Sequence, residues 1–181
     1  MTGHDLHASD IGLAVALDLA NVALEAGGPP AVREVFAAAP VSVTSIDDAQ
    51  AEHLLGLAQR SAQVAALMAS GARDDLDRAA ELVNDLLDRS PAQLHLTRDP
   101  QGWTLHHHRP DAPLERAWSA VVAGAFARVI GDRRASRVGS CDAADCGRFF
   151  YDMSKNRSRR YCSLACQNRT KAATYRSRRV S

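Results

Sequence analysis

All four cysteines of this 181-residue chain lie in its last third, at Cys141, Cys146, Cys162 and Cys166. They form two close pairs, C-x4-C and C-x3-C, separated by fifteen residues. Thiolates are soft donors, and four of them can surround a tetrahedral Zn²⁺ at about 2.3 Å each. Close pairs of this kind are typical of zinc sites. The sequence therefore predicts one structural zinc ion per chain, held by these four sulfurs.

Two alternatives use the same cysteines, namely two disulfides or four unrelated buried thiols. Disulfides require an oxidising compartment. The N-terminal stretch MTGHDLHASD is polar and has no basic segment leading into an apolar one, so it does not resemble a secretory signal. Four unrelated thiols are not expected to gather in so short a segment. The sequence favours zinc, and with it a cytoplasmic location.

The segment between the two pairs indicates a small finger. The aromatic run Phe149 to Tyr151 is suited to a short strand, and a polar turn follows it. Ser163 can cap a helix that begins just after Cys162, which would place Cys166 in the first turn beside Cys162. A knuckle, a hairpin and a helix start around one metal give a treble-clef-like finger. Because about 45 residues bury little apolar surface, we expect this module to be disordered without zinc.

The C-terminal segment resembles the CGNR zinc-finger family over roughly residues 137–180. The matching residues are Phe150, Tyr151, Asp152, Ser154, Asn156, Arg157, Arg159, Arg160, the run Tyr161 to Ser163, the run Cys166 to Arg169, and Lys171. The family motif has glycine where this chain has Gln167. The resemblance implies a stress-induced transcription regulator that binds DNA, with an ABATE-like helical domain before the finger.

Charge is distributed unevenly along the chain. The formal net charge is +1, yet residues 128–181 hold 14 basic and 4 acidic residues, whereas residues 1–127 hold 8 and 17. A cluster of positive charge at one end is the pattern expected of a nucleic-acid contact. The alternative is a basic tail that docks on the acidic part of its own chain.

We predict that basic and amide side chains of the finger contact double-stranded DNA, because they can neutralise phosphates and hydrogen-bond to base edges. The candidates are Arg157, Arg159, Arg160, Asn168, Arg169, Lys171, Arg176, Arg178 and Arg179. For Asn168 and Arg169 a role within the finger is the alternative, with Arg169 packing on Tyr151 or pairing with Asp152.

The rest of the chain is predicted to be mainly helical. Periodic apolar residues and turn signals predict helices over residues 11–25, 31–38, 46–70, 73–88 and 114–131. Asp10 is the expected cap of the first helix, and Thr44 or Ser45 that of the third. The predicted architecture is a helical domain with one β-hairpin over residues 1–134, followed by the finger with its basic C-terminal helix over residues 135–181. No apolar run is long enough to span a membrane.

Asp18 and Asn21 lie one turn apart in the otherwise apolar first predicted helix. They indicate either a polar pocket or a contact with a neighbouring helix. The alternatives are an exposed helical face and a hydrogen bond within the chain.

Residues 93–97 and 103–108 alternate polar and apolar side chains on either side of a turn, which predicts a β-hairpin. We expect Leu94, Leu96, Trp103 and Leu105 on its inward face, and His95, Thr104, His106 and His108 on the other. A metal site on the histidines is one interpretation, and a solvated polar face is the alternative. Histidine also titrates near neutral pH.

Three functions compete. The first is a DNA-binding transcription regulator whose N-terminal domain senses a small-molecule effector or forms a homodimer. The second is a zinc-dependent adaptor that binds proteins and not DNA. The third is an enzyme, which we do not expect, because no phosphate-binding glycine loop, HExxH or GxSxG motif is present and zinc held by four sulfurs has no open position.

Overall fold

The structure, a computed structural model, describes residues 8–40, 43, 45–99 and 102–180. It is mainly helical with two small antiparallel hairpins, which confirms the predicted fold class. The helices are α1 (Ala8–Leu24), α2 (Pro29–Ala38), α3 (Asp48–Ser70), α4 (Arg73–Arg89), α5 (Leu114–Gly131) and α6 (Leu164–Val180), with a 3-10 turn η1 (Ala135–Arg137). The strands are β1 (His95–Asp99), β2 (Gly102–His106), β3 (Val138–Ser140) and β4 (Phe149–Tyr151).

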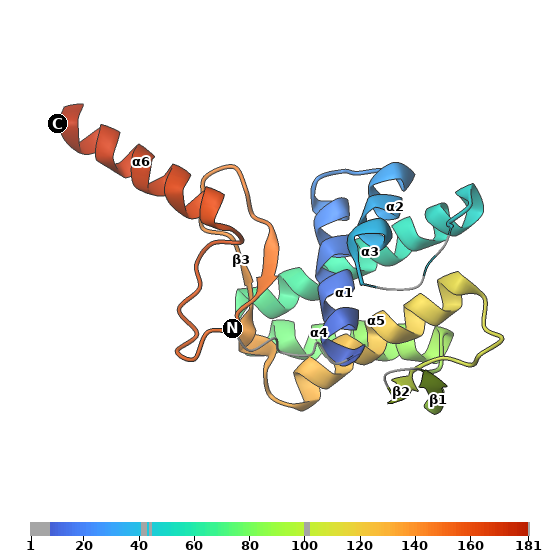
Figure 1. The fold of residues 1–181 in the computed structure, drawn as a ribbon. Coiled ribbons are helices and arrows are strands. Elements are labelled where there is room, and N and C mark those ends of the chain that lie inside the picture. The colour runs from blue at the N-terminus through green and yellow to red at the C-terminus, as the bar shows by residue number, and fades with distance from the viewer. Residues whose placement is uncertain (1–7, 41–42, 44, 100–101, 181) are drawn as a thin grey trace.

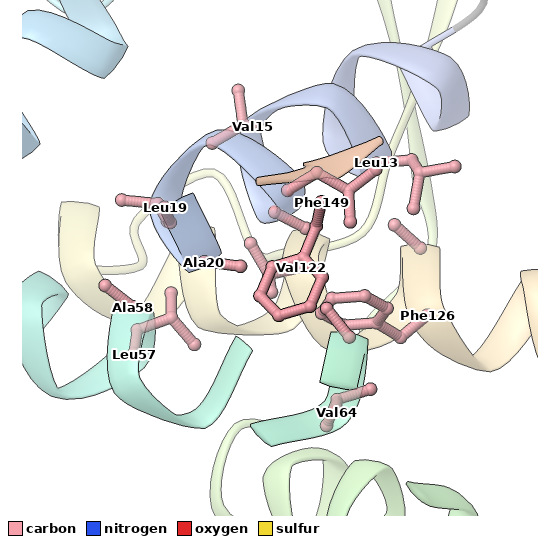
Figure 2. Close-up of a cluster of buried hydrophobic side chains, with 14 of the residues drawn as sticks. Leu13, Val15, Leu19, Ala20, Leu57, Ala58, Val64, Val122, Phe126 and Phe149 are labelled. Carbon is pink, nitrogen blue, oxygen red and sulfur yellow. The ribbon is translucent and has the colours of Figure 1, made fainter. Parts of the chain in front are cut away.

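Helices α1 to α5 form what we call the helical body. Helix α1 lies at its centre and packs against α2, α3 and α5 (Figure 1). Its middle is apolar on nearly every side, so Val15, Leu19 and Ala20 are buried. Figure 2 shows Ala20 beside Val122 in α5, and Leu19 belongs to the same apolar cluster as Leu57 in α3. The helix starts at Ala8, so Asp10 lies inside it and does not precede it as predicted. No helix in the described residues has the length and apolar content to cross a membrane.

The cap of α3 differs from the prediction. Asp47 accepts a hydrogen bond from the Gln50 backbone N–H at 2.8 Å, and the Asp47 N–H donates to the Gln50 side chain at 3.0 Å. This reciprocal pair satisfies two backbone donors at once, which is why the helix begins after Asp47 and not after Ser45. Thr44, the other predicted cap, lies outside the described residues. The helix ends as predicted, at Gly71 in the left-handed region with φ of 72°.

Strands β1 and β2 form the predicted hairpin, with His95 opposite His106 and Leu96 opposite Leu105. The predicted inward face is wrong. Trp103 is 68% exposed, and Leu94 and Leu96 are exposed to a similar degree. The face that carries the histidines and threonines is half-buried. Alternation along a strand shows that its two faces differ and does not show which one meets the protein. Next to the hairpin, His107 lies against α5, where a side chain on Gly124 would come within 3.4 Å of its ring.

Strands β3 and β4 pair antiparallel, with Gly139 opposite Phe150. The aromatic strand was predicted, but its partner precedes the first cysteine pair and was not. Val138 and Phe149 belong to the same apolar cluster as the helices, and Figure 2 shows Phe149 beside Val122 and Phe126. The first part of the predicted finger is therefore built into the core of the helical body. The division at residue 134 remains a prediction.

Candidate metal centre

The four cysteine sulfurs converge on one point. All four donor atoms lie within 4.8 Å of one another. The sulfurs of Cys146, Cys162 and Cys166 are separated by 3.6, 3.6 and 3.7 Å. Tetrahedral zinc with bonds of about 2.3 Å requires sulfurs about 3.8 Å apart, whereas a disulfide bond is about 2.05 Å long. The donor set fits Zn²⁺, so the four cysteines are positioned to bind one ion, as predicted.

Two tight backbone features present the sulfurs. Cys141 and Cys146 lie in the loop that joins β3 to β4, where Asp145 and Gly147 adopt positive φ of 59° and 66°. The Cys146 N–H donates to the carbonyl of Ala143 at 3.2 Å, which closes the loop. Cys162 and Cys166 flank the start of α6. The Ser163 hydroxyl accepts from the Cys166 N–H at 3.2 Å, which confirms Ser163 as the helix cap.

The thiols do not ionise equally before metal binds. A hydrogen bond with Ser163 lowers the pKa of Cys166 to about 7, against the effect of its burial. Burial, together with hydrogen bonds from neighbouring thiols, raises the pKa of Cys162 to about 12. Burial also raises the pKa of Cys146. Zinc binds thiolates, so binding displaces protons from these groups, and the affinity for zinc falls as the pH is lowered.

Arg159 ties the second half of the finger together. Its guanidinium donates to the carbonyls of Tyr161 at 2.9 Å, Tyr151 at 3.2 Å and Cys162. It also lies 4.7 Å from the centre of the Phe150 ring. All three guanidinium nitrogens are therefore used within the finger. The structure thus places this predicted DNA contact in a supporting position, where it holds the backbone of a zinc ligand.

Substitution of Arg159 by alanine is expected to weaken zinc binding. The change frees the carbonyl of Cys162, and outer-shell partners of metal ligands typically contribute roughly 10- to 100-fold to metal affinity. Competition with a chromophoric chelator measures the effect. Arg159→Lys is expected to fail as well, because the single ammonium nitrogen of lysine cannot replace the three separate guanidinium nitrogens that bind the three carbonyls. Arg157→Ala is the matched control, since the Arg157 side chain donates to the Ser136 hydroxyl and not to a residue next to the metal site. Equal affinities in all variants would contradict this role.

A buried carboxylate organises the loop before Arg159. Asp152 is 4% exposed and accepts from the backbone N–H groups of Ser154 at 2.7 Å and Arg159 at 2.9 Å. Burial raises the pKa of Asp152, but these hydrogen bonds and the charge of Arg137 outweigh it and hold the pKa below its usual value. Arg137 donates to the carbonyls of Asp152 and Ser154. The loop from Asp152 to Arg159 is therefore held by contacts that do not involve the metal.

Three other predicted DNA contacts also have partners within the finger or next to it. Arg157 donates to the Ser136 hydroxyl at 3.1 Å. Arg160 forms an ion pair with Asp142 at 2.7 Å, which links the loops that carry the two cysteine pairs. Arg169 points to the metal site, with a nitrogen 3.5 Å from the sulfur of Cys166. An N–H directed at a ligand sulfur stabilises its negative charge.

The remaining candidates lie along α6, which extends away from the helical body (Figure 1). Asn168, Lys171 and Arg176 are exposed, and none of their side chains forms a hydrogen bond or ion pair within the described residues. Arg178 and Arg179 belong to the same helix, but their side chains lie outside the described residues. Cys166 is the buried residue of this helix within the part that the structure describes.

Asn21 has a partner that the sequence did not predict. Its side-chain amide accepts from the N–H of Phe149 at 2.7 Å and donates to the carbonyl of the same residue at 3.1 Å. Asn21 is 3% exposed. Its amide makes the two hydrogen bonds to the backbone of β4 that a neighbouring strand would otherwise make. This is the hydrogen-bond alternative to a pocket. One turn further on, Glu25 forms an ion pair with Arg148 at 2.5 Å.

Asp18 lies on the same side of α1. Partial burial of its carboxyl raises its pKa, while the charge of Arg148 acts in the opposite direction. Asp18, Asn21 and Glu25 are spaced three and four residues apart, so they share one helical face. The polar face of α1 is thus directed at the strand that leads out of the cysteine loop. Two hollows on the finger, each about 360 Å³, are both lined by Tyr161, and neither includes Asp18 or Asn21 in its wall.

Comparison with known families agrees with this geometry. Residues 137–179 match the family model described as CGNR zinc finger. The match spans both cysteine pairs and most of α6, so the resemblance seen in the sequence is confirmed over this segment. No curated protein matches the chain significantly.

Proposed function

We propose that the protein is a transcription regulator that binds double-stranded DNA through α6. The observation that carries the proposal is the charge and exposure of α6. This 17-residue helix has no acidic residue, and its side chains from Lys171 to Ser177 are exposed. A helix that is polar all round gains little from packing on its own protein. A polyanion is a suitable partner for it.

The dimensions of α6 suit duplex DNA. At about 1.5 Å per residue its 17 residues span about 25 Å. The major groove of B-form DNA is about 12 Å wide and admits an α-helix. The zinc site fixes the first turn of α6, so the angle at which the helix leaves the finger is set by the cysteines. Metal binding would therefore orient the helix before DNA is met.

The side chains of the finger divide into two groups in this proposal. Arg157, Arg159, Arg160 and Arg169 support the finger, because each is engaged within the protein. Asn168, Lys171 and Arg176 meet the DNA. Asn168 and Lys171 are three residues apart and share a face. The Asn168 side chain can form paired hydrogen bonds with adenine, whereas Lys171 and Arg176 can neutralise phosphates.

Helix α1 gives the helical body a route to the finger. It contacts β4 through Asn21 and the loop before β4 through Glu25. A shift of α1, caused by an effector or by dimerisation of the helical body, would move β4 and the cysteine loop with it. We propose that this contact is how the state of the helical body is transmitted to the DNA-binding part.

The double variant Lys171→Ala/Arg176→Ala is expected to bind DNA more weakly than the wild type, by a similar factor on every sequence. Removal of one phosphate contact reduces the slope of log affinity against log salt by about 0.9, so removal of two should reduce it by about 1.8. Fluorescence anisotropy with a labelled random-sequence duplex over a salt series measures both the affinity and the slope.

The matched control is Arg73→Ala/Arg98→Ala, which removes two positive charges from exposed positions of α4 and β1, outside the finger. It is expected to leave the salt slope unchanged. If both double variants weakened binding equally, net charge alone would explain the affinity and α6 would have no special role. If the wild type bound no duplex but retained a protein partner after nuclease treatment, the adaptor function would replace this one.

A further inference from the structure

Three histidine rings gather on one face of the β1–β2 hairpin. His95 and His106 are opposite each other in the strand register, and His108 follows two residues later. The ring centres are 5.0 Å apart for His95 and His106, 5.4 Å for His106 and His108, and 5.9 Å for His95 and His108. The cluster lies outside the part of the chain that matches the zinc finger.

The burial of this face is unusual. The hairpin exposes Leu94, Leu96 and Trp103, whereas the side chains of the histidine face are half-buried. Within it, Nδ1 of His95 is buried and has no hydrogen-bond partner. A buried polar atom without a partner costs about 1–3 kcal/mol, and native proteins contain few of them. This nitrogen is therefore a candidate donor to a ligand.

The rings of His106 and His108 each use one nitrogen in a hydrogen bond to a protein oxygen, as histidines that bind metals do. Nδ1 of His108 lies 2.8 Å from the carbonyl of Arg109, so it carries the proton and leaves the lone pair on Nε2. Nε2 of His106 lies 2.7 Å from the hydroxyl of Thr97. In metal sites the second ring nitrogen of a histidine ligand typically bonds to a carbonyl or another polar group, which fixes the ring and its tautomer.

We propose that His95, His106 and His108 bind a divalent transition-metal ion, at a second site that is separate from the four cysteines. Imidazole suits Zn²⁺, Cu²⁺ and Ni²⁺. With metal–nitrogen bonds of about 2.1 Å, ring centres around a tetrahedral ion lie roughly 5 Å apart. The observed separations are close to this value. Three protein ligands leave one position of the ion for water.

Small ring rotations complete the site. Without metal, among the described residues, only the four thiols place all their donor atoms within 4.8 Å of one another. Rotation of the His95 ring, whose plane is now 19° from that of His106, would turn its unpartnered Nδ1 toward the other two rings, while His106 keeps its bond to Thr97. Because His95 and His106 are on paired strands, the ion would link β1 to β2 across a two-stranded sheet, which is a marginally stable structure in water.

The test is a zinc titration of protein that already holds one equivalent of zinc in its cysteine site. Isothermal titration calorimetry is expected to detect one further equivalent. His106→Ala removes one of the three proposed ligands. Because removal of an outer-shell partner already lowers metal affinity roughly 10- to 100-fold, the affinity of the histidine site for zinc should fall by about 100-fold or more in this variant. The resonances of the His95 and His108 rings should shift when the second equivalent is added to the wild type.

His53→Ala is the matched control, because His53 is exposed on α3 and away from the hairpin. It is expected to keep both equivalents of zinc. The circular dichroism of His106→Ala should match the wild type, so that weaker binding is not caused by unfolding. A wild-type protein that takes up only one equivalent, or a second equivalent that persists in His106→Ala, would overturn the proposal.

Discussion

Removal of zinc is expected to unfold the chain from Tyr161 to Val180 and the loop from Cys141 to Cys146, and to leave the helical body folded. The apolar cluster around the cysteines contains little besides the ligands, Ala143 and Tyr161. Structural zinc contributes about 10–16 kcal/mol to the folding of finger peptides, and nothing in this small cluster replaces it. Strands β3 and β4 should remain, because Val138 and Phe149 lie in the core of the helical body.

Hydrogen exchange before and after chelation measures this difference. Amides of α6 should lose protection, and amides of β3 and β4 should keep it. Cys162→Ser should reproduce the chelated state, and adding zinc back should restore the wild type but not the variant. Two results would contradict this account: amides of α6 that stay protected without metal, or unfolding of the whole chain on chelation. Either would show that zinc does not stabilise α6 separately from the core that stabilises β3 and β4.

Asn21→Ala is expected to lower the free energy of unfolding by about 2–6 kcal/mol. The substitution leaves both the N–H and the carbonyl of Phe149 buried without a partner. Each such group costs about 1–3 kcal/mol. Urea denaturation of the zinc-loaded protein, followed by circular dichroism of the helical body, measures the effect.

Asn168→Ala is the control for Asn21→Ala, since it makes the same change at an exposed position of α6. Its effect on stability should stay within about 0.5 kcal/mol. Because Asn168 is assigned to the DNA contact, its variant should bind DNA more weakly instead. Equal denaturation midpoints for the two variants would mean that the Asn21 contact with β4 does not hold the finger to the helical body.

Features whose signal is local could be predicted correctly from the sequence. The helices follow from apolar periodicity, and the zinc ligands follow from the spacing of two cysteine pairs. Ser163 was identified as a cap because its hydroxyl acts on a backbone N–H three residues away. The cap of α3 was missed, although Asp47 and Gln50 carry an equally local signal in the form of a capping box.

Features that depend on distant residues were not predictable in the same way. Asn21 and Phe149 are 128 residues apart, and nothing near either residue indicates the other. The same holds for the pairing of β3 with β4, which only the folded core selects. The hairpin was predicted with the wrong face inward, because alternation does not define which side of a strand meets the protein. Every arginine of the finger also carries the same charge in the sequence. The structure separates Arg159, whose guanidinium is bound to three carbonyls, from Arg176, whose side chain has no hydrogen bond or ion pair within the described residues.

The most direct test of the account is the affinity of the zinc-loaded wild-type protein for duplex DNA as a function of salt. If the zinc site presents α6 to the phosphate backbone, the affinity should fall steeply as salt rises, with a log–log slope steeper than about −2, and binding should disappear after chelation. An affinity that does not change with salt, or binding that survives removal of zinc, would contradict it.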